Sequence, residues 1–310
     1  MNPAGARISP ADAAETLLRA ELAQGDAVLA SVGPVLRHLV ASDDHSVFSE
    51  EVVARTRGLI EALAAQLLRA VCLASGRDAP RGEASAALIT ALIARPSLLA
   101  HCHALALEAQ ITERLADQAR LDPVLSPLLQ AQLAAPVADI AALAMQALAA
   151  QARFIQSQRR METTPAELPA DLLHEALGAL AEVCGDEAAP ATAAIRSNYD
   201  EARSRLGLLA RLVLGLDHDR SAALDLMHAG PALFLTALSL AAMHMRGEVV
   251  LATSDGQQVR LAAMLAAAER SAPEIEAALL LLHPDSSPPR HYLALGRDAA
   301  AALLAGDLQA

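Results

Sequence analysis

Three adjacent side chains, His101, Cys102 and His103, form the densest group of metal-capable residues in the sequence. Imidazole and thiolate groups bind zinc, but two ligands on one helix need a spacing of three or four residues. Positions two apart point about 200° away from each other, so the two imidazoles cannot chelate one ion from a single helix. We therefore expect a core cysteine with at least one surface histidine, and no metal ion or cofactor.

Two other histidines lie close to carboxylates in the sequence. Asp217, His218 and Asp219 could form an Asp-His dyad, yet no serine or cysteine stands in a recognisable nucleophile elbow. Helix capping by the aspartates explains the same residues, and His283 with Asp285 is typical of a helix stop and loop. No catalytic residue is predicted. A non-enzymatic protein is favoured, although enzymatic activity stays open.

One basic stretch, at residues 153–160, contains an aromatic side chain. A helix would place Arg153, Gln156 and Arg160 on one side, where guanidinium groups can bind phosphate or an acidic protein face. The alternative is a solvated last helical turn, in which cations offset the helix dipole. We take Arg153, Gln156, Arg159 and Arg160 as candidate partner-binding residues.

A second candidate surface involves Tyr199 and Arg203, which would lie four residues apart on one helical face. It is predicted to be an interaction edge. The alternative is an exposed helical face supported by an ion pair between Glu201 and Arg205.

The elements that must position these residues are predicted to be helices. Apolar residues make up 54% of the chain, whereas Phe, Trp and Tyr supply only 2%. Alanine and leucine are strong helix formers, while strands favour β-branched and aromatic residues. The fold class is therefore all-α, an array of about a dozen antiparallel helices. The expected helices cover residues 10–23, 26–41, 49–75, 83–94, 97–119, 123–134, 137–159, 169–184, 191–215, 219–228, 231–246, 255–269, 273–283 and 297–305.

Two segments allow more than one interpretation. Residues 247–261 could form a β-hairpin, because Val249 to Thr253 is rich in β formers, but the run that follows Gly256 favours a helix. Residues 226–245 contain no charged Asp, Glu or Arg and are long enough to span a bilayer. Gly230 and Pro231 interrupt them, so a central buried helix is predicted and no membrane span is expected.

The sequence is compatible with two domain arrangements. A chain of 310 residues suits either two packed helical subdomains or one continuous array. The strongest break lies at Met161 to Pro169, which carries two prolines. We therefore expect subdomains at residues 1–160 and 161–310.

Short helices, tight turns and alanine-rich second helices recur in the sequence, as in HEAT-like arrays. Apolar residues at 233–238, 249–251 and 260–268 also follow an order that resembles an alphaproteobacterial family of unknown function. The resemblance covers residues 200–283. It implies a HEAT-like helical array, but it assigns no activity and no functional residue.

Charge and cysteine content restrict the classes of function. The formal net charge is -12, and the 24 basic residues are all arginine, so lysine-dependent catalysis is excluded. A DNA-binding regulator is disfavoured, since the third predicted helix opens with Glu50 and Glu51, and no nucleic-acid partner is expected. Three scattered cysteines and no apolar leader before Pro10 favour a cytoplasmic protein.

Taken together, these features predict a non-enzymatic helical scaffold or adaptor that binds a protein partner through a groove or concave face. Self-association into a homo-oligomer is compatible with the sequence. The alternative function is binding of a small apolar ligand, with or without catalysis, in a core pocket near residues 231–269.

Overall fold

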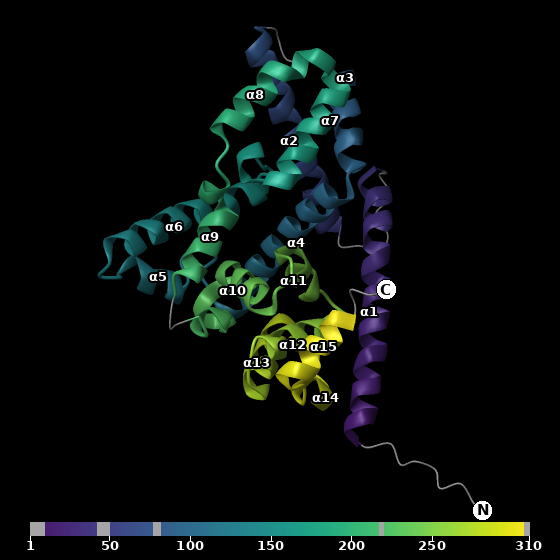
Figure 1. Ribbon diagram of the computed structural model, residues 1–310, viewed down its shortest axis with the longest axis vertical. Coiled ribbons are helices and arrows are strands. Elements are labelled where there is room, and N and C mark those ends of the chain that lie inside the picture. The colour runs from purple at the N-terminus through teal and green to yellow at the C-terminus, as the bar shows by residue number, and fades with distance from the viewer. Residues whose placement is uncertain (1–9, 42–49, 77–81, 217–219, 307–310) are drawn as a thin grey trace, which may run out of the picture. The chain divides into compact units, whose positions relative to one another are not determined.

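The computed structural model describes residues 10–41, 50–76, 82–216 and 220–306. These residues form α-helices and short 3-10 turns, and no β-strand occurs among them (Figure 1). The all-α fold class is therefore confirmed.

The α-helices have the following bounds: α1 Pro10–Ala41, α2 Glu50–Ser75, α3 Glu83–Ile93, α4 Pro96–Ala119, α5 Pro127–Leu133, α6 Ala138–Arg159, α7 Ala170–Cys184, α8 Ala188–Asn198, α9 Arg205–Leu214, α10 Leu226–Ala242, α11 Arg246–Ala252, α12 Gln258–Ala267, α13 Ala272–Leu282, α14 Arg290–Leu293 and α15 Arg297–Gly306. The 3-10 turns are η1 Pro165–Glu167, η2 Gly185–Glu187, η3 Glu201–Arg203 and η4 Ala222–Leu224.

The helix predicted at residues 191–215 is wrong, because the chain breaks it between α8 and α9. Asp200 accepts a hydrogen bond from the Ala202 N–H, and the Ser204 hydroxyl accepts one from the Gly207 N–H. Such side chains compete with the helical hydrogen bonds and favour caps and turns. α8 consequently ends at Asn198, and α9 starts afresh at Arg205.

Near the start of the chain, the two helices predicted at residues 10–23 and 26–41 form the single helix α1. Near α5 the opposite occurs, since the predicted start at Pro123 is four residues too early. The Asp122 carboxylate instead accepts hydrogen bonds from the N–H groups of Val124 and Leu125 in a turn. Ser126 then caps α5 through the Leu129 N–H.

The segment at residues 247–261 is helical in α11 and α12, with a turn between them, so the hairpin alternative is wrong. The predicted interruption before residue 231 lies inside α10. Gly230 there has φ 71° and ψ 162°, and Pro231 begins the second part of the helix. Residues 231–238 are all buried, as a core helix requires.

The chain divides into two compact units, residues 32–237 and residues 1–31 with 238–310. They differ from the expected subdomains 1–160 and 161–310. Within the larger unit, α6 and α9 pack against each other across the predicted boundary.

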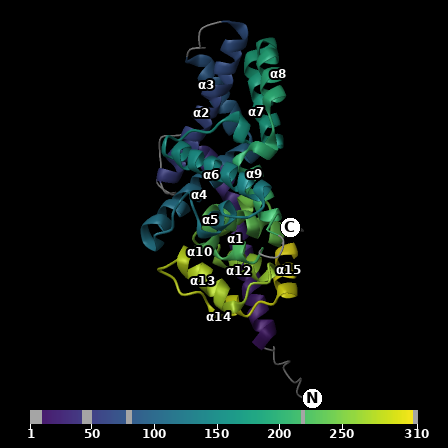
Figure 2. The ribbon, with the colours of Figure 1, turned by 90° about the vertical axis from the view of Figure 1, so that its left-hand side faces the viewer.

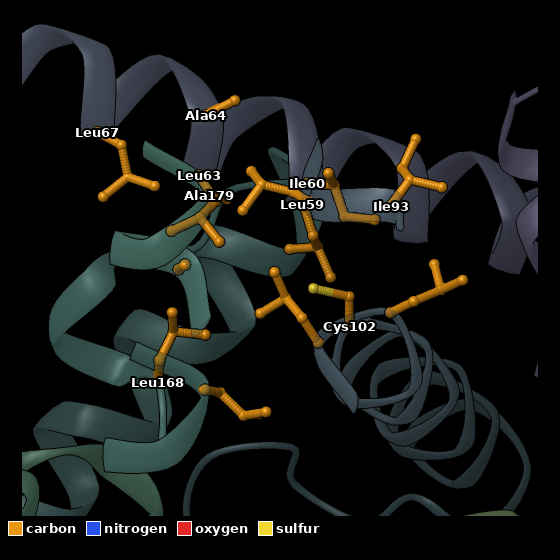
Figure 3. Packing of buried hydrophobic residues seen from close by; sticks show 14 of the residues in the cluster. Leu59, Ile60, Leu63, Ala64, Leu67, Ile93, Cys102, Leu168 and Ala179 are labelled. Carbon is orange, nitrogen blue, oxygen red and sulfur yellow. The ribbon is translucent and has the colours of Figure 1, made fainter. Parts of the chain in front are cut away.

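The core of the larger unit is built around α2, which packs on α3, α4 and α8. Leu59, Leu63 and Leu67 follow one another along its buried face, opposite residues such as Leu168 and Ala179 (Figure 3). These leucines recur every four residues in the sequence, which is the spacing of one helical face. α7 and α8 lie side by side in the same unit (Figure 2).

By length and composition alone, α2 could cross a membrane. Two pairs of helices could also cross it if each pair were a single broken span. These pairs are α3 with α4, which are bent by 89°, and α10 with α11, which are bent by 112°. The expectation of no membrane span therefore stays a prediction.

In the smaller unit, α12 is the central element and packs on α13 and α15 (Figure 1). Residues 259–266 of α12 are all buried. Gln257, just before the helix, donates a hydrogen bond to the carbonyl oxygen of Gly25, and Arg260 forms an ion pair with Asp26. The first part of α1 is thereby tied to residues more than two hundred positions later.

Candidate functional site

The smaller unit carries an apolar groove, which we call the methionine groove, with a volume of about 640 Å³. Its walls come from the end of α10, the start of α11, the end of α12 and α15. The lining residues are Ser239, Leu240, Ala242, Met243, His244, Met245, Glu248, Ala267, Ala301, Leu304 and Ala305.

The C-terminus of α10 determines where the methionines lie. Met243 has φ 56°, and the N–H of His244 donates to the carbonyl oxygen of Ser239. This is the hydrogen bond of a Schellman end, in which the left-handed residue is usually glycine. The turn leaves Met243 91% exposed and Met245 71% exposed. Two large apolar side chains therefore stand in solvent beside one groove.

The remaining walls are small and mostly apolar. Leu304 of α15 is buried, and Ala267 and Ala301 also line the groove with short side chains. At the rim, His244 Nδ1 lies 3.2 Å from a carboxylate oxygen of Glu248, the one acidic side chain among the described lining residues. Methionine is flexible and polarizable, so the groove can adapt to apolar side chains of different shapes.

The four candidate residues of the basic stretch are exposed at the C-terminal end of α6. Arg160 forms the C-cap of that helix, and Arg153 lines a cavity inside the larger unit. Cations at this end of a helix match the solvated last turn that the sequence allowed as an alternative. Their role in partner binding stays a prediction.

Tyr199 and Arg203 do not share a helical face, because Tyr199 caps α8 and Arg203 lies in η3. The Tyr199 hydroxyl donates to the carbonyl oxygen of Leu168 at 2.8 Å. Burial, with nearby carboxylates such as Glu201, raises the pKa of Tyr199 to about 12. Tyr199 thus joins two segments of the larger unit, while Arg203 is exposed.

The larger unit also contains a buried cluster that was not predicted from the sequence, formed by Glu108, Gln151, Phe154 and Arg205. Arg205 pairs with Glu108 through two hydrogen bonds, one of them 3.3 Å long. Its Nε donates to Gln151 Oε1 at 2.8 Å, and its guanidinium carbon lies 3.6 Å from the Phe154 ring centre. We name these four residues the Arg205 cluster. Arg205 therefore pairs with Glu108, whereas the alternative interpretation of this segment supposed an ion pair with Glu201.

A sequence signal for half of this cluster did exist. Glu108 lies within the apolar run of α4 and is 0% exposed, on a helix face where a carboxylate needs a partner. The partner is 97 positions away, and spacing rules that operate within one helix cannot reach it.

The side chains of His101, Cys102 and His103 are more deeply buried than the sequence suggests. Cys102 and His103 are both buried, and His101 is half-buried. Burial raises the pKa of the Cys102 thiol to about 12 and lowers that of His103 to about 4. Both groups are therefore neutral near pH 7. Within the described ranges, no three His, Cys, Asp or Glu side chains are grouped as metal ligands would be.

The remaining histidines near carboxylates make separate local pairs. His283 Nδ1 lies 3.1 Å from Asp255, and His291 Nε2 lies 3.4 Å from Glu21. The candidate dyad at residues 217–219 lies outside the described residues.

Comparison with protein-family models, curated proteins and solved structures finds no match for this chain. The resemblance to the alphaproteobacterial family stays a prediction, and the function must be argued from the geometry.

Proposed function

We propose that this chain is a non-enzymatic helical adaptor that holds an apolar helical segment of a partner protein in the methionine groove. The observation that carries the proposal is the exposure of Met243 and Met245 beside a groove lined mostly by alanine and leucine. Solvent-exposed clusters of large apolar side chains, rimmed by polar groups, are typical of interaction sites. Helix-in-groove recognition uses this combination of surfaces.

The charge around the groove indicates what kind of segment fits. Its described lining is apolar apart from Ser239, His244 and Glu248. Glu248 lies at the rim, and the whole chain carries a formal net charge of -12. An amphipathic helix with an apolar stripe and a basic residue at its edge would complement both features.

This proposal retains the partner-binding function expected from the sequence, together with a cytoplasmic location and no nucleic-acid partner. The packing of α5 on α6 and of α11 on α12 supports the expected HEAT-like pairing of neighbouring helices. The groove also overlaps residues 231–269, where the alternative function expects a small apolar ligand.

The test is a photo-crosslinking amino acid at position 245 of the full chain, expressed in its native cells. We expect crosslinks to one protein, mapped by mass spectrometry to an amphipathic helical segment. The double substitution Met243→Glu and Met245→Glu should abolish binding of a synthetic peptide of that segment. Leu17→Glu is the matched control, because Leu17 is also exposed, at 54%, but lies outside the groove. Its binding should be unchanged.

Three results would overturn the proposal. Crosslinks that join two copies of the chain, with a dimer in light scattering, would make the groove a self-association surface. A small molecule retained in native mass spectrometry and lost in the double variant would favour the ligand-binding alternative. Equal peptide binding by the double variant and the Leu17→Glu control would exclude the groove.

A further inference from the structure

The larger unit contains a cavity of about 230 Å³ next to the Arg205 cluster. Phe154, Leu105 and Leu206 supply apolar walls, and Gln158 and Arg205 line it as well. A cavity of roughly 150 Å³ is enough to hold benzene. This cavity therefore has room for a single-ring molecule with a small polar substituent.

Gln158 is the feature that points to a ligand. Its side chain is 2% exposed, and its Oε1 has no hydrogen-bond partner among the described residues. An unsatisfied buried carbonyl is costly, so such atoms call for an explanation. A glutamine amide offers an acceptor and two donors side by side, and a group with a donor beside an acceptor satisfies both.

The charges around the cavity favour an uncharged ligand. Arg205 is already paired with Glu108, and a carboxylate oxygen of Glu167 accepts the Arg205 backbone N–H at the start of α9, 2.7 Å away. The other charged lining residues, Arg153 and Glu162, are exposed and solvated at the opening. A charged ligand would lose its hydration without gaining an uncompensated partner charge.

We propose that this cavity binds a small neutral amide or lactam, with its ring against Phe154 and Leu206 and its amide paired with Gln158. The site is separate from the methionine groove: the two lie in different units and share no residue. Failure of one proposal therefore leaves the other standing.

The test compares three ring compounds of similar size with the full-length protein: benzamide, benzoate and ethylbenzene. Titration calorimetry in millimolar solution should show benzamide binding more tightly than both others. Gln158→Met keeps the length of the side chain but removes the amide, and should weaken benzamide binding about tenfold. Gln156→Met is the matched control, because Gln156 is exposed on the same helix and does not line the cavity.

A second measurement does not depend on the variant folding. In NMR spectra of the unmodified protein, benzamide should shift the proton signal of a buried glutamine side-chain amide, because that proton is sensitive to hydrogen bonding. Ethylbenzene should leave the same signal nearly unchanged. Preference for benzoate would overturn the neutral-ligand proposal. Equal binding of ethylbenzene and benzamide would show that the cavity binds apolar rings without using the Gln158 amide, and would overturn the proposal. Absence of binding by all three compounds would also refute it.

Discussion

The Arg205 cluster shows how a single buried residue can depend on another far along the chain. The side chains of Glu108 and Arg205 are 0% and 4% exposed. Removing two charges from water costs several kcal/mol per ion. The attraction between the charges and their additional hydrogen bonds offset this cost but add little net stability. Gln151 and Phe154 supply such additional contacts to the guanidinium group. The pair is thus sensitive to loss of either member rather than a large net source of stability.

We expect Glu108→Gln to lower the free energy of unfolding by about 3–5 kcal/mol, because it removes the carboxylate charge that faces the buried Arg205 guanidinium group. The double variant Glu108→Leu with Arg205→Met removes both charges and should be less destabilised than Glu108→Gln. Urea unfolding followed by circular dichroism measures both. A double variant that is the less stable of the two would contradict the argument.

His103 makes a second prediction at this scale. Its pKa falls from 6.5 to about 4 on burial, so the unfolded chain takes up the proton first as pH falls. Stability from the neutral imidazole is present above pH 6.5 and is lost between about pH 6.5 and 4, by roughly 3 kcal/mol.

Urea unfolding at pH 7.5 and pH 4 should therefore show a larger loss for the unmodified protein than for His103→Gln, which cannot titrate. The comparison removes the contribution of carboxylates common to both proteins. Identical losses would show that His103 does not govern this range.

At the scale of elements, the break inside α10 depends on one glycine. Gly230 has φ 71°, and a Cβ added there would lie 3.0 Å from the Cβ of Ser126, the residue that caps α5. The break therefore lets α10 approach the start of α5 closely. A residue with a side chain would meet both backbone strain and a steric contact.

Gly230→Ala should destabilise the protein by about 1–3 kcal/mol. Gly178→Ala is the matched substitution, since Gly178 lies within α7 and a Cβ there meets only the flexible Arg95 guanidinium group, at an ordinary contact distance of 3.6 Å. It should stabilise the protein by about 0.5–1 kcal/mol. Thermal unfolding of the two variants should shift in opposite directions, and a shift in the same direction would refute the role given to Gly230.

At the scale of the whole molecule, the smaller unit combines residues from before position 32 and after position 237. Leu22 of α1 is 2% exposed. Leu22→Ala should cost about 2–5 kcal/mol and speed amide exchange in α12 and α15 more than in α2. Leu17→Ala, at an exposed site of the same helix, should change little. Equal acceleration in α2 and α12 would argue against two separate units.

Local signals predicted most of the fold. The helices predicted at residues 49–75 and 273–283 correspond closely to α2 and α13. α13 begins with a capping box between Ser271 and Glu274. The prediction failed where Asp200 and Ser204 divided the helix expected at residues 191–215, because capping competed with helix propensity. The complete Arg205 cluster could not be predicted from the sequence, because its members come from three separate helices, α4, α6 and α9. The methionine groove was missed because the exposure of Met243 depends on one left-handed turn.

Because the smaller unit is made from two distant parts of the chain, the two units complete their folding in a fixed order during synthesis on the ribosome. Residues 32–237 form a continuous stretch and can complete their packing as they emerge. The start of α1 must wait for some 200 further residues, roughly 10–40 s at 5–20 residues per second. During that interval Leu18 and Leu22 have no final burial site. We expect the nascent chain to bind a holding chaperone through this segment until α12 and α15 have been synthesised.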